Sequence, residues 1–273
     1  INAFRIFPKL CLSSPEKRCG KTTTLEVISA LVCKQLNASN VTPAAIFRAI
    51  DHWQPTLLID EADTFLSGNE EMRGIINSGH RKSGAFVLRV DGEGAAMVPK
   101  KFSTWAPMAI AMIGEPPDTI VDRSIMVMLR RKQSNERIHK LPIDPAKSWY
   151  EIRQKCQRWY NDNLQKLQQA EPTIPNVGND RAEDNWLPLM AIAELLGGDW
   201  PTQIKSAMLA IENDKMENDD DAKGKILVDI QQAFTEKNTD RLSSHDLVDY
   251  LLSLEDRPWG EWRGGKEMTK RSL

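Results

Sequence analysis

The segment SPEKRCGKTT, residues 14–23, restricts the fold of this chain more than any other feature of its sequence. Gly20, Lys21 and Thr22 match the end of the pattern Gly-x-x-x-x-Gly-Lys-Ser/Thr. This pattern forms a phosphate-binding loop between a strand and a helix. Residues 9–14 (KLCLSS) suit a short strand that runs into a loop, and residues 21–35 repeat apolar side chains at helical spacing. The sequence therefore predicts a strand, a loop and a helix that open a parallel α/β sheet.

The residues of this loop suit a nucleoside triphosphate and its metal ion. Backbone N–H groups of the loop can surround a phosphate, and the amino end of the following helix adds the positive end of its dipole. Lys21 is expected to reach the β- and γ-phosphates of ATP, and the Thr22 hydroxyl is expected to bind Mg²⁺. Pro15 replaces the first glycine of the pattern, so a chance Gly-Lys-Thr before an ordinary helix is the alternative. The expected nucleotide-binding residues are Lys17, Arg18, Cys19, Gly20, Lys21, Thr22 and Thr23.

A second motif, PTLLIDEAD at residues 55–63, is an apolar run that ends in two acids. Such a run favours a strand buried on both faces of a parallel sheet. Asp60 is expected to hold Mg²⁺ and Glu61 to polarise the attacking water, because adjacent carboxylates need an opposing positive charge. An acidic turn after an ordinary strand is the alternative. Together the two motifs predict a P-loop NTPase domain that binds ATP with Mg²⁺ and hydrolyses it, with Lys21 and the Asp60-Glu61 pair converging from neighbouring core strands.

The rest of the chain continues the α/β pattern and then becomes helical. Strands are predicted at 108–113 and 124–129, helices at 43–53 and 70–78, and a hairpin within 84–103. Later helices are predicted at 147–169, 182–196, from about Pro201, at 222–234, after a cap at Ser244 and in the last six residues, with an acidic linker at 212–221. The expected domains are a P-loop ATPase core at 1–132, a helical region at 133–213 and a partial winged-helix-like segment at 222–273.

Arg123 directly precedes the predicted strand at 124–129. Ring-forming ATPases place an arginine at this point that acts in the neighbouring subunit's site, so Arg123 is the candidate finger. A surface arginine paired with Asp122 is the alternative, and Arg130 and Arg131 are second candidates. No polar sensor residue is assigned after strand 108–113.

Residues 72–101 carry six cations and two carboxylates, although the chain has a formal net charge of −2. A basic hairpin here could follow a nucleic-acid backbone in the pore of a ring, and an ordinary solvated hairpin is the alternative. His80 is interpreted as a helix cap or an interface group rather than a catalytic residue. The candidate DNA-binding residues are Arg81, Lys82, Arg89, Lys100 and Lys101.

Composition excludes several other classes. The four cysteines have no CxxC spacing, which favours reduced thiols in a cytoplasmic protein. No apolar run approaches the roughly 20 residues of a membrane span, and no signal peptide is recognised. The absence of an initiator Met and the ending within an expected helix indicate a fragment of a longer protein.

Five long strings of the sequence carry a family resemblance: SPEKRCGKTT, LLIDEADTFL, NEEMRGIINSGHRKSGAFVLR, FSTWAPMAIAMIG and PDTIVDRSIMVMLRRK. They resemble a family of P-loop, AAA-like ATPases with an uncharacterised domain, carried by phages and integrative elements beside primase or helicase modules. The resemblance is close over residues 9–132 and looser to Arg263. It implies an AAA-like core with a helical region and a winged-helix-like segment, and a role in phage or mobile-element DNA replication. It implies that Lys21 and Thr22 bind the nucleotide and Mg²⁺, and that Asp60 and Glu61 act on the metal ion and the attacking water. It also implies that Arg123 is the candidate arginine finger.

Two functions follow as hypotheses. The first is a homo-oligomeric ring ATPase that moves the hairpin along single-stranded or forked DNA as a helicase-like motor, with a primase as a further partner. The second is an ATP-dependent regulatory or loader switch that binds DNA or a partner protein without unwinding. A phosphotransferase acting on a small substrate is disfavoured, because the Asp-Glu pair suits water as the acceptor and no lid motif is found.

Overall fold

The computed structural model describes residues 2–39, 41–66, 68–91, 97–254, 257–262 and 267–273, without the side chains of residues 65, 216–223, 258 and 261. The chain divides into two compact units, Ile1–Lys205 and Ser206–Leu273. The finer domain division expected from the sequence stays a prediction. All four cysteines are free thiols, and Cys11 and Cys19 are buried.

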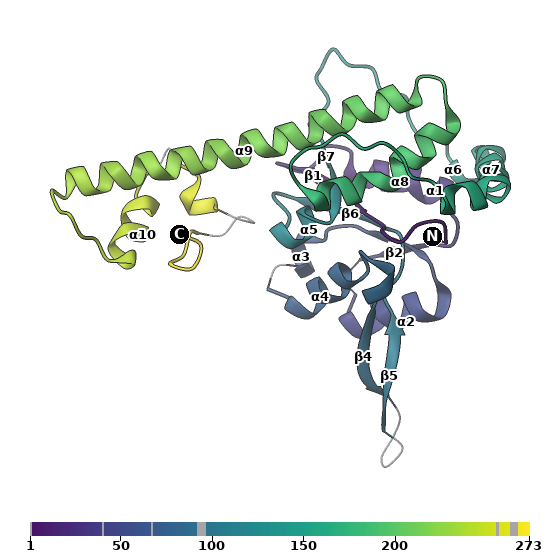
Figure 1. Cartoon of the computed structure of the whole chain (residues 1–273), viewed down its shortest axis with the longest axis horizontal. Coiled ribbons are helices and arrows are strands. Elements are labelled where there is room, and N and C mark those ends of the chain that lie inside the picture. Colours follow the sequence, from purple (N-terminus) through teal and green to yellow (C-terminus); the bar gives the residue numbers. More distant parts are fainter. Residues whose placement is uncertain (1, 40, 67, 92–96, 255–256, 263–266) are drawn as a thin grey trace. The chain divides into compact units, whose positions relative to one another are not determined.

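The first unit contains a five-stranded parallel sheet with the strand order β2-β3-β6-β1-β7, which confirms the predicted α/β class (Figure 1). Its strands are β1 (Lys9–Ser14), β2 (Gln35–Ala38), β3 (Thr56–Ile59), β6 (Met108–Ile113) and β7 (Ser124–Met128). Strand β2 was not predicted. The sequence favoured a helix to residue 35, but helix α1 (Lys21–Leu31) ends earlier. This edge strand exposes two of its four residues, so it lacks the apolar run that marks the inner strands.

Helices cover both faces of this sheet because the chain crosses it in two directions. Helix α1 lies in the connection from β1 to β2, and the later connections run the opposite way. Right-handed crossovers in opposite directions place their helices on opposite faces. Leu25 of α1 accordingly packs with Leu12 and Leu58, whereas Ile59 and Ile110 pack with the helices of the other face. Those helices are α2 (Pro43–Trp53), α4 (Glu70–Ser78) and α5 (Asp118–Val121), and the short helix α3 (Asp63–Leu66) follows β3.

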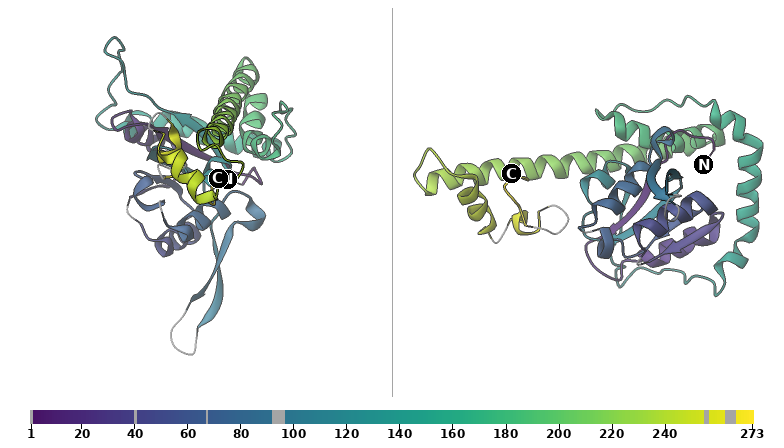
Figure 2. Two further views of the ribbon diagram at one scale, coloured as in Figure 1. Left: turned by 90° about the vertical axis from the view of Figure 1, so that its left-hand side faces the viewer. Right: turned by 90° about the horizontal axis from the view of Figure 1, so that it is seen from below.

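A β-hairpin projects from this core, as Figures 1 and 2 show. Strands β4 (Phe86–Asp91) and β5 (Val98–Ser103) pair antiparallel, which confirms the predicted hairpin, and Gly92 of its predicted turn lies outside the described residues. A short 3₁₀ turn, η1 (Lys82–Gly84), precedes β4. The base of the hairpin is anchored by Phe102, whose ring centroid lies 4.9 Å from that of Phe47 in α2.

The remaining helices of the first unit are α6 (Pro145–Ser148), α7 (Tyr150–Gln168) and α8 (Asp180–Leu196). They confirm the predicted helix at 182–196 and most of the one at 147–169, which is interrupted at Trp149 between α6 and α7. Asn179 caps α8, and Gly197 ends it with a φ of 72°, a left-handed conformation that glycine adopts without strain. A small core joins α7 and α8 to the start of the chain through Ala3, Leu167 and Ala191.

Helix α9 (Trp200–Glu236) begins in the first unit and continues into the second, so the linker predicted at 212–221 is wrong. Six of the ten residues in this segment are Asp or Asn, which are weak helix formers, so its composition alone favoured a linker; it contains no proline that would break a helix. Helix α10 (Ser244–Leu252) follows, capped by Ser243 rather than by Ser244. The last residues form a turn where a helix was predicted. Among the described residues, no helix combines the length and apolarity needed to cross a membrane.

The second unit has a small core of its own, built from Leu251, Trp259 and Met268. Asp229 of α9 is fully buried and accepts hydrogen bonds from the Trp259 indole, at 2.8 Å, and from Arg257. Trp259 lies in the 3₁₀ turn η3 (Pro258–Glu261). The winged-helix-like character of this unit stays a prediction.

Candidate functional site

The loop between β1 and α1 adopts a conformation that exposes backbone donors. Gly20 has a φ of 89° and Arg18 a φ of 66°, both in the left-handed region. An added Cβ at Gly20 would meet nothing within 4 Å, so glycine suits this position for its conformation and not for space. Left-handed residues in a tight loop turn successive N–H groups toward one side and form a concavity suited to an anion. The loop with these two residues leads directly into the amino end of α1.

Lys21 lies across this loop. Its Nζ donates hydrogen bonds to Ser14 Oγ and, at 3.2 Å, to the Glu16 carbonyl oxygen. Ser14 is the last residue of β1 and is fully buried. The motif did not mark Ser14 as a site residue, because nothing in the local pattern tells which atoms the lysine contacts.

Thr22 and Asp60 meet at the carboxyl edge of the sheet. The Thr22 hydroxyl donates to Asp60 Oδ2 at 2.9 Å, and the Glu61 backbone N–H donates to Asp60 Oδ1 at 2.9 Å. The sequence suggested that these residues come from neighbouring strands, which is wrong, because β6 lies between β1 and β3. Parallel strands end at one edge, so the two groups converge across that intervening strand. A hydroxyl and a carboxylate are the hard oxygen donors that Mg²⁺ prefers, so these residues fit the metal.

Glu61 has an unusual backbone conformation. Its φ of 53° is left-handed, which is uncommon for a residue with a side chain and often marks functional sites. The Thr64 hydroxyl donates to the Glu61 carbonyl oxygen at 2.8 Å, and Ala62 N–H donates to the Ala111 carbonyl of β6 at 3.0 Å. Asp63, also unmarked by the sequence, accepts from Ile113 N–H at 3.2 Å. The contacts of Ala62 and Asp63 with β6 therefore hold the acidic segment directly after this bend.

A cavity of about 800 Å³ adjoins Thr22, Asp60 and Glu61. Its other walls come from α1, from the end of β2 and from residues 141–146, which lead into α6. Ligand pockets commonly fall in the range of roughly 300–1,000 Å³, so the space beside these residues suits a bound molecule.

The other predicted loop residues differ in exposure. Lys17, Arg18 and Thr23 are exposed, whereas the Cys19 side chain is buried, with Sγ 3.8 Å from the Lys17 carbonyl oxygen. Cys19 can therefore offer its backbone N–H to a phosphate but not its thiol.

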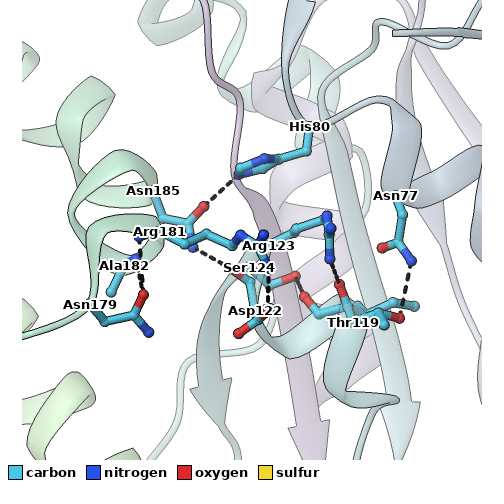
Figure 3. A network of polar contacts seen from close by, with 11 residues as sticks. Asn77, His80, Thr119, Asp122, Arg123, Ser124, Asn179, Arg181, Ala182 and Asn185 are labelled. Carbon is cyan, nitrogen blue, oxygen red and sulfur yellow. Dashed lines mark hydrogen bonds and ion pairs between the residues drawn. The ribbon is translucent and has the colours of Figure 1, made fainter. Parts of the chain in front are cut away.

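Arg123 lies at the opposite, amino edge of the sheet, between α5 and β7 (Figure 3). Its guanidinium donates to the Thr119 carbonyl oxygen at 2.8 Å. Asp122, the partner considered from the sequence, forms its ion pair with Arg181 of α8 instead. Burial lowers the pKa of Arg123, and so does the nearby Arg181. From this edge, Arg123 cannot serve the Lys21 loop of its own chain.

Two buried bases lie beside Arg123. His80 Nε2 is 2.7 Å from Asn185 Oδ1, and Asn185 Nδ2 donates to the Asp122 carbonyl at 3.0 Å, so we assign the His80 proton to Nε2 (Figure 3). Burial lowers the pKa of His80 to about 4, and that of Lys9 to about 7. Lys9 is 2% exposed, and its Nζ has no hydrogen-bond partner in the described structure.

The candidate DNA-binding residues do not form one surface. Arg81 pairs with Asp184 of α8 at 2.7 Å, and Lys82 is exposed in η1, so neither lies on the hairpin. On the hairpin, Arg89 and Lys100 face each other across the strands, and Lys101 points to the other face. Arg89 pairs with Glu71 at 2.6 Å, Lys100 pairs with Asp91 at 3.3 Å, and Lys101 Nζ lies 3.7 Å from the Phe86 ring centroid.

The face of the hairpin that carries Lys101 also carries Leu88 and Val90, which are 61% and 54% exposed. Exposed apolar side chains in a projecting hairpin are typical of a surface that contacts another molecule. The hairpin therefore carries cations held in ion pairs on one face and exposed apolar side chains on the other.

Comparison with known proteins gives two relationships. A protein of Saccharopolyspora erythraea, described as an uncharacterised 28.9 kDa protein in the xis 5′ region, is 35% identical over 102 residues. This stretch covers 37% of this chain and 37% of that protein, so the chain spans little more than a third of the relative's length. A family described as Protein of unknown function (DUF3631) matches residues 128–273, a region that begins at the end of β7 and leaves out Lys21 and Asp60. Because this match spans more than half of the sequence, the chain belongs to the DUF3631 family.

Proposed function

We propose that this protein is a P-loop ATPase that binds ATP with Mg²⁺ and hydrolyses it. The hydrogen bond from the Thr22 hydroxyl to Asp60, at 2.9 Å, carries the proposal. It unites the two sequence motifs at one point, with Lys21 at the start of α1 and Glu61 beside Asp60. In open parallel sheets, ligands bind outside the carboxyl ends of the strands where the chain reverses its direction, and β1 ends at such a point.

Each residue has a distinct task in this proposal. The N–H groups of the loop bind phosphate oxygens, and Lys21 exchanges its contacts with Ser14 and the Glu16 carbonyl for phosphate. Thr22 and Asp60 would hold Mg²⁺, which when bound offsets negative charge on the phosphates. Glu61 orients a water molecule and accepts its proton as that water attacks the γ-phosphate.

Lys21→Ala and Glu61→Gln separate binding from hydrolysis. Lys21→Ala should abolish binding of a fluorescent ATP analogue, because the loop loses its side-chain cation, whereas the exposed Lys82→Ala should bind normally. Glu61→Gln should bind ATP but release phosphate slowly, by roughly 10²-fold or more, since the general base is lost. Tight ATP binding by Lys21→Ala would refute the loop assignment, and normal turnover by Glu61→Gln would remove that residue from the reaction.

We further propose that hydrolysis is coupled to DNA handling in an oligomer, as a helicase-like motor of phage or mobile-element replication. The location of Arg123 at the edge opposite its own Lys21 loop supports action on a neighbouring copy. The description of the relative as lying in the xis 5′ region agrees with a mobile-element setting. In mixtures of Arg123→Ala and Glu61→Gln subunits, activity should recover in part. An absence of recovery in assembled mixtures would exclude action in trans.

The hairpin favours the alternative, a switch that binds a partner protein without unwinding DNA. Arg89 and Lys100 are occupied by ion pairs, while Leu88 and Val90 are exposed. The ATPase rate with and without single-stranded DNA, followed by a strand-displacement assay, separates the two functions. Stimulation with displacement supports the motor, and no effect of DNA supports the switch.

A further inference from the structure

We propose that Arg131 binds the nucleotide phosphates in its own chain and that Glu16 holds it beside the loop until they arrive. This inference rests on the proposed ATP site. Arg131 follows β7, the strand that pairs with β1 on the side away from β6. Leu129 N–H donates to the Ser13 carbonyl at 2.7 Å, so the chain stays in register with β1 up to the loop. Arg131 is thereby brought to the same carboxyl edge as Lys21.

The contacts of Arg131 are with the phosphate-binding loop itself. Its Nε lies 3.2 Å from Glu16 Oε1, and its terminal nitrogen approaches the Lys17 carbonyl oxygen at 3.5 Å. Glu16 also links to Lys21, because its backbone carbonyl accepts from the Lys21 Nζ. Two cations, Lys21 at the start of α1 and Arg131 after β7, therefore both contact Glu16.

The charge of this loop explains the pairing. Glu16 is the only acid in residues 14–23, and a carboxylate here would repel a triphosphate unless a cation offset it. The Arg131 and Glu16 side chains are 54% and 51% exposed, and exposed ion pairs contribute little to stability. A phosphate offers a guanidinium stronger, bidentate hydrogen bonds and more negative charge. A bound triphosphate can therefore replace Glu16 as the partner of Arg131, because breaking this exposed ion pair costs little free energy.

The preceding residue provides an internal comparison. Arg130 donates to Glu136 through both terminal nitrogens, at 3.0 and 2.5 Å, and Glu136 also accepts from Gln133 N–H at 2.7 Å. Arg130 thus orders the segment after β7, while Arg131 contacts the loop. Both were candidate fingers for a neighbouring subunit, but the contacts of Arg131 place it at its own site.

The test is equilibrium binding of a fluorescent ATP analogue with Mg²⁺ to the wild-type chain and to Arg131→Ala, Arg130→Ala, Glu16→Gln and Lys21→Ala. Arg131→Ala should weaken binding about 10-fold, the effect of losing a charge-assisted hydrogen bond, and Arg130→Ala should change it by less than about 2-fold. Glu16→Gln should tighten binding, because it removes both the competitor for Arg131 and the repulsion. Inorganic tripolyphosphate, used as a competitor, should also bind Arg131→Ala more weakly than it binds the wild-type chain, because Arg131 contacts the phosphates and not the base.

Wild-type affinity in Arg131→Ala, or an equal loss in Arg130→Ala, would overturn the role of Arg131. The proposed function fails separately, if the wild-type chain shows no saturable ATP binding or if Lys21→Ala binds as the wild type does. Circular dichroism and thermal melting of each variant establish that a loss of affinity does not come from unfolding. Arg131→Lys should recover only part of the affinity, because an ammonium group cannot form the bidentate contact.

Discussion

Replacing the buried Lys9 by methionine should make the protein more stable and remove a pH dependence. Lys9 begins β1, is 2% exposed and has an Nζ without a hydrogen-bond partner in the described structure. Burial, together with a smaller effect of the positive charge of Arg123, lowers its pKa from 10.5 to about 7. Methionine has a similar length and an unbranched shape, so it can fill the same space without a charge.

The magnitude follows from the pKa. At about 1.36 kcal/mol for each pH unit, a fall from 10.5 to about 7 means that keeping Lys9 charged costs the folded state on the order of 5 kcal/mol. The unfolded chain keeps this proton up to about pH 10.5, whereas the folded chain releases it near pH 7. The unfolded state therefore binds more protons in this window, and wild-type stability should rise as the pH increases from 7 to 10. Below pH 7 the full cost is present.

Urea unfolding at pH values from 6 to 10 measures this effect, with Lys82→Met as the control for loss of an exposed lysine. The difference between Lys9→Met and the wild type isolates Lys9 from other titrating groups. The variant should be more stable by several kcal/mol at pH 6, and the difference should shrink as the pH approaches 10. A difference that does not depend on pH, or a variant less stable than the wild type at pH 6, would refute the reasoning.

Two further predictions concern packing. Gly79→Ala should destabilise the first unit by roughly 1–3 kcal/mol in urea unfolding, because its Cβ would collide with the backbone carbonyl of Thr104, whereas Gly74→Ala has open space in α4 and should be neutral or stabilising. Equal effects of the two changes would contradict this account. Asp229→Ala should destabilise the second unit by roughly 3–5 kcal/mol, because it leaves Trp259 without its buried acceptor and removes an ion pair of Arg257. Faster hydrogen exchange of the α10 amides should report the change, and the exposed Asp240→Ala should leave them protected.

Local patterns were sufficient for much of the fold. Strands β1, β3 and β6, helix α2 and the hairpin were all predicted, because each depends on residues that are close in sequence. Strand β2 and the helical state of residues 212–221 were missed. Both segments are polar, so neither shows an apolar pattern that would indicate its conformation. Strand β2 forms by pairing with β3, and residues 212–221 continue a helix that begins at Trp200.

The two motifs by themselves identified Lys21, Thr22, Asp60 and Glu61 as candidates, because a phosphate-binding loop and an acidic strand end have short, recognisable patterns. Only the tertiary structure showed that β6 lies between the two motif strands, that Asp122 forms an ion pair with Arg181, and that Arg131 forms one with Glu16. These relations depend on how crossovers order the strands and on which side chains meet across that order. Such contacts join residues far apart in the chain, and no local spacing encodes them.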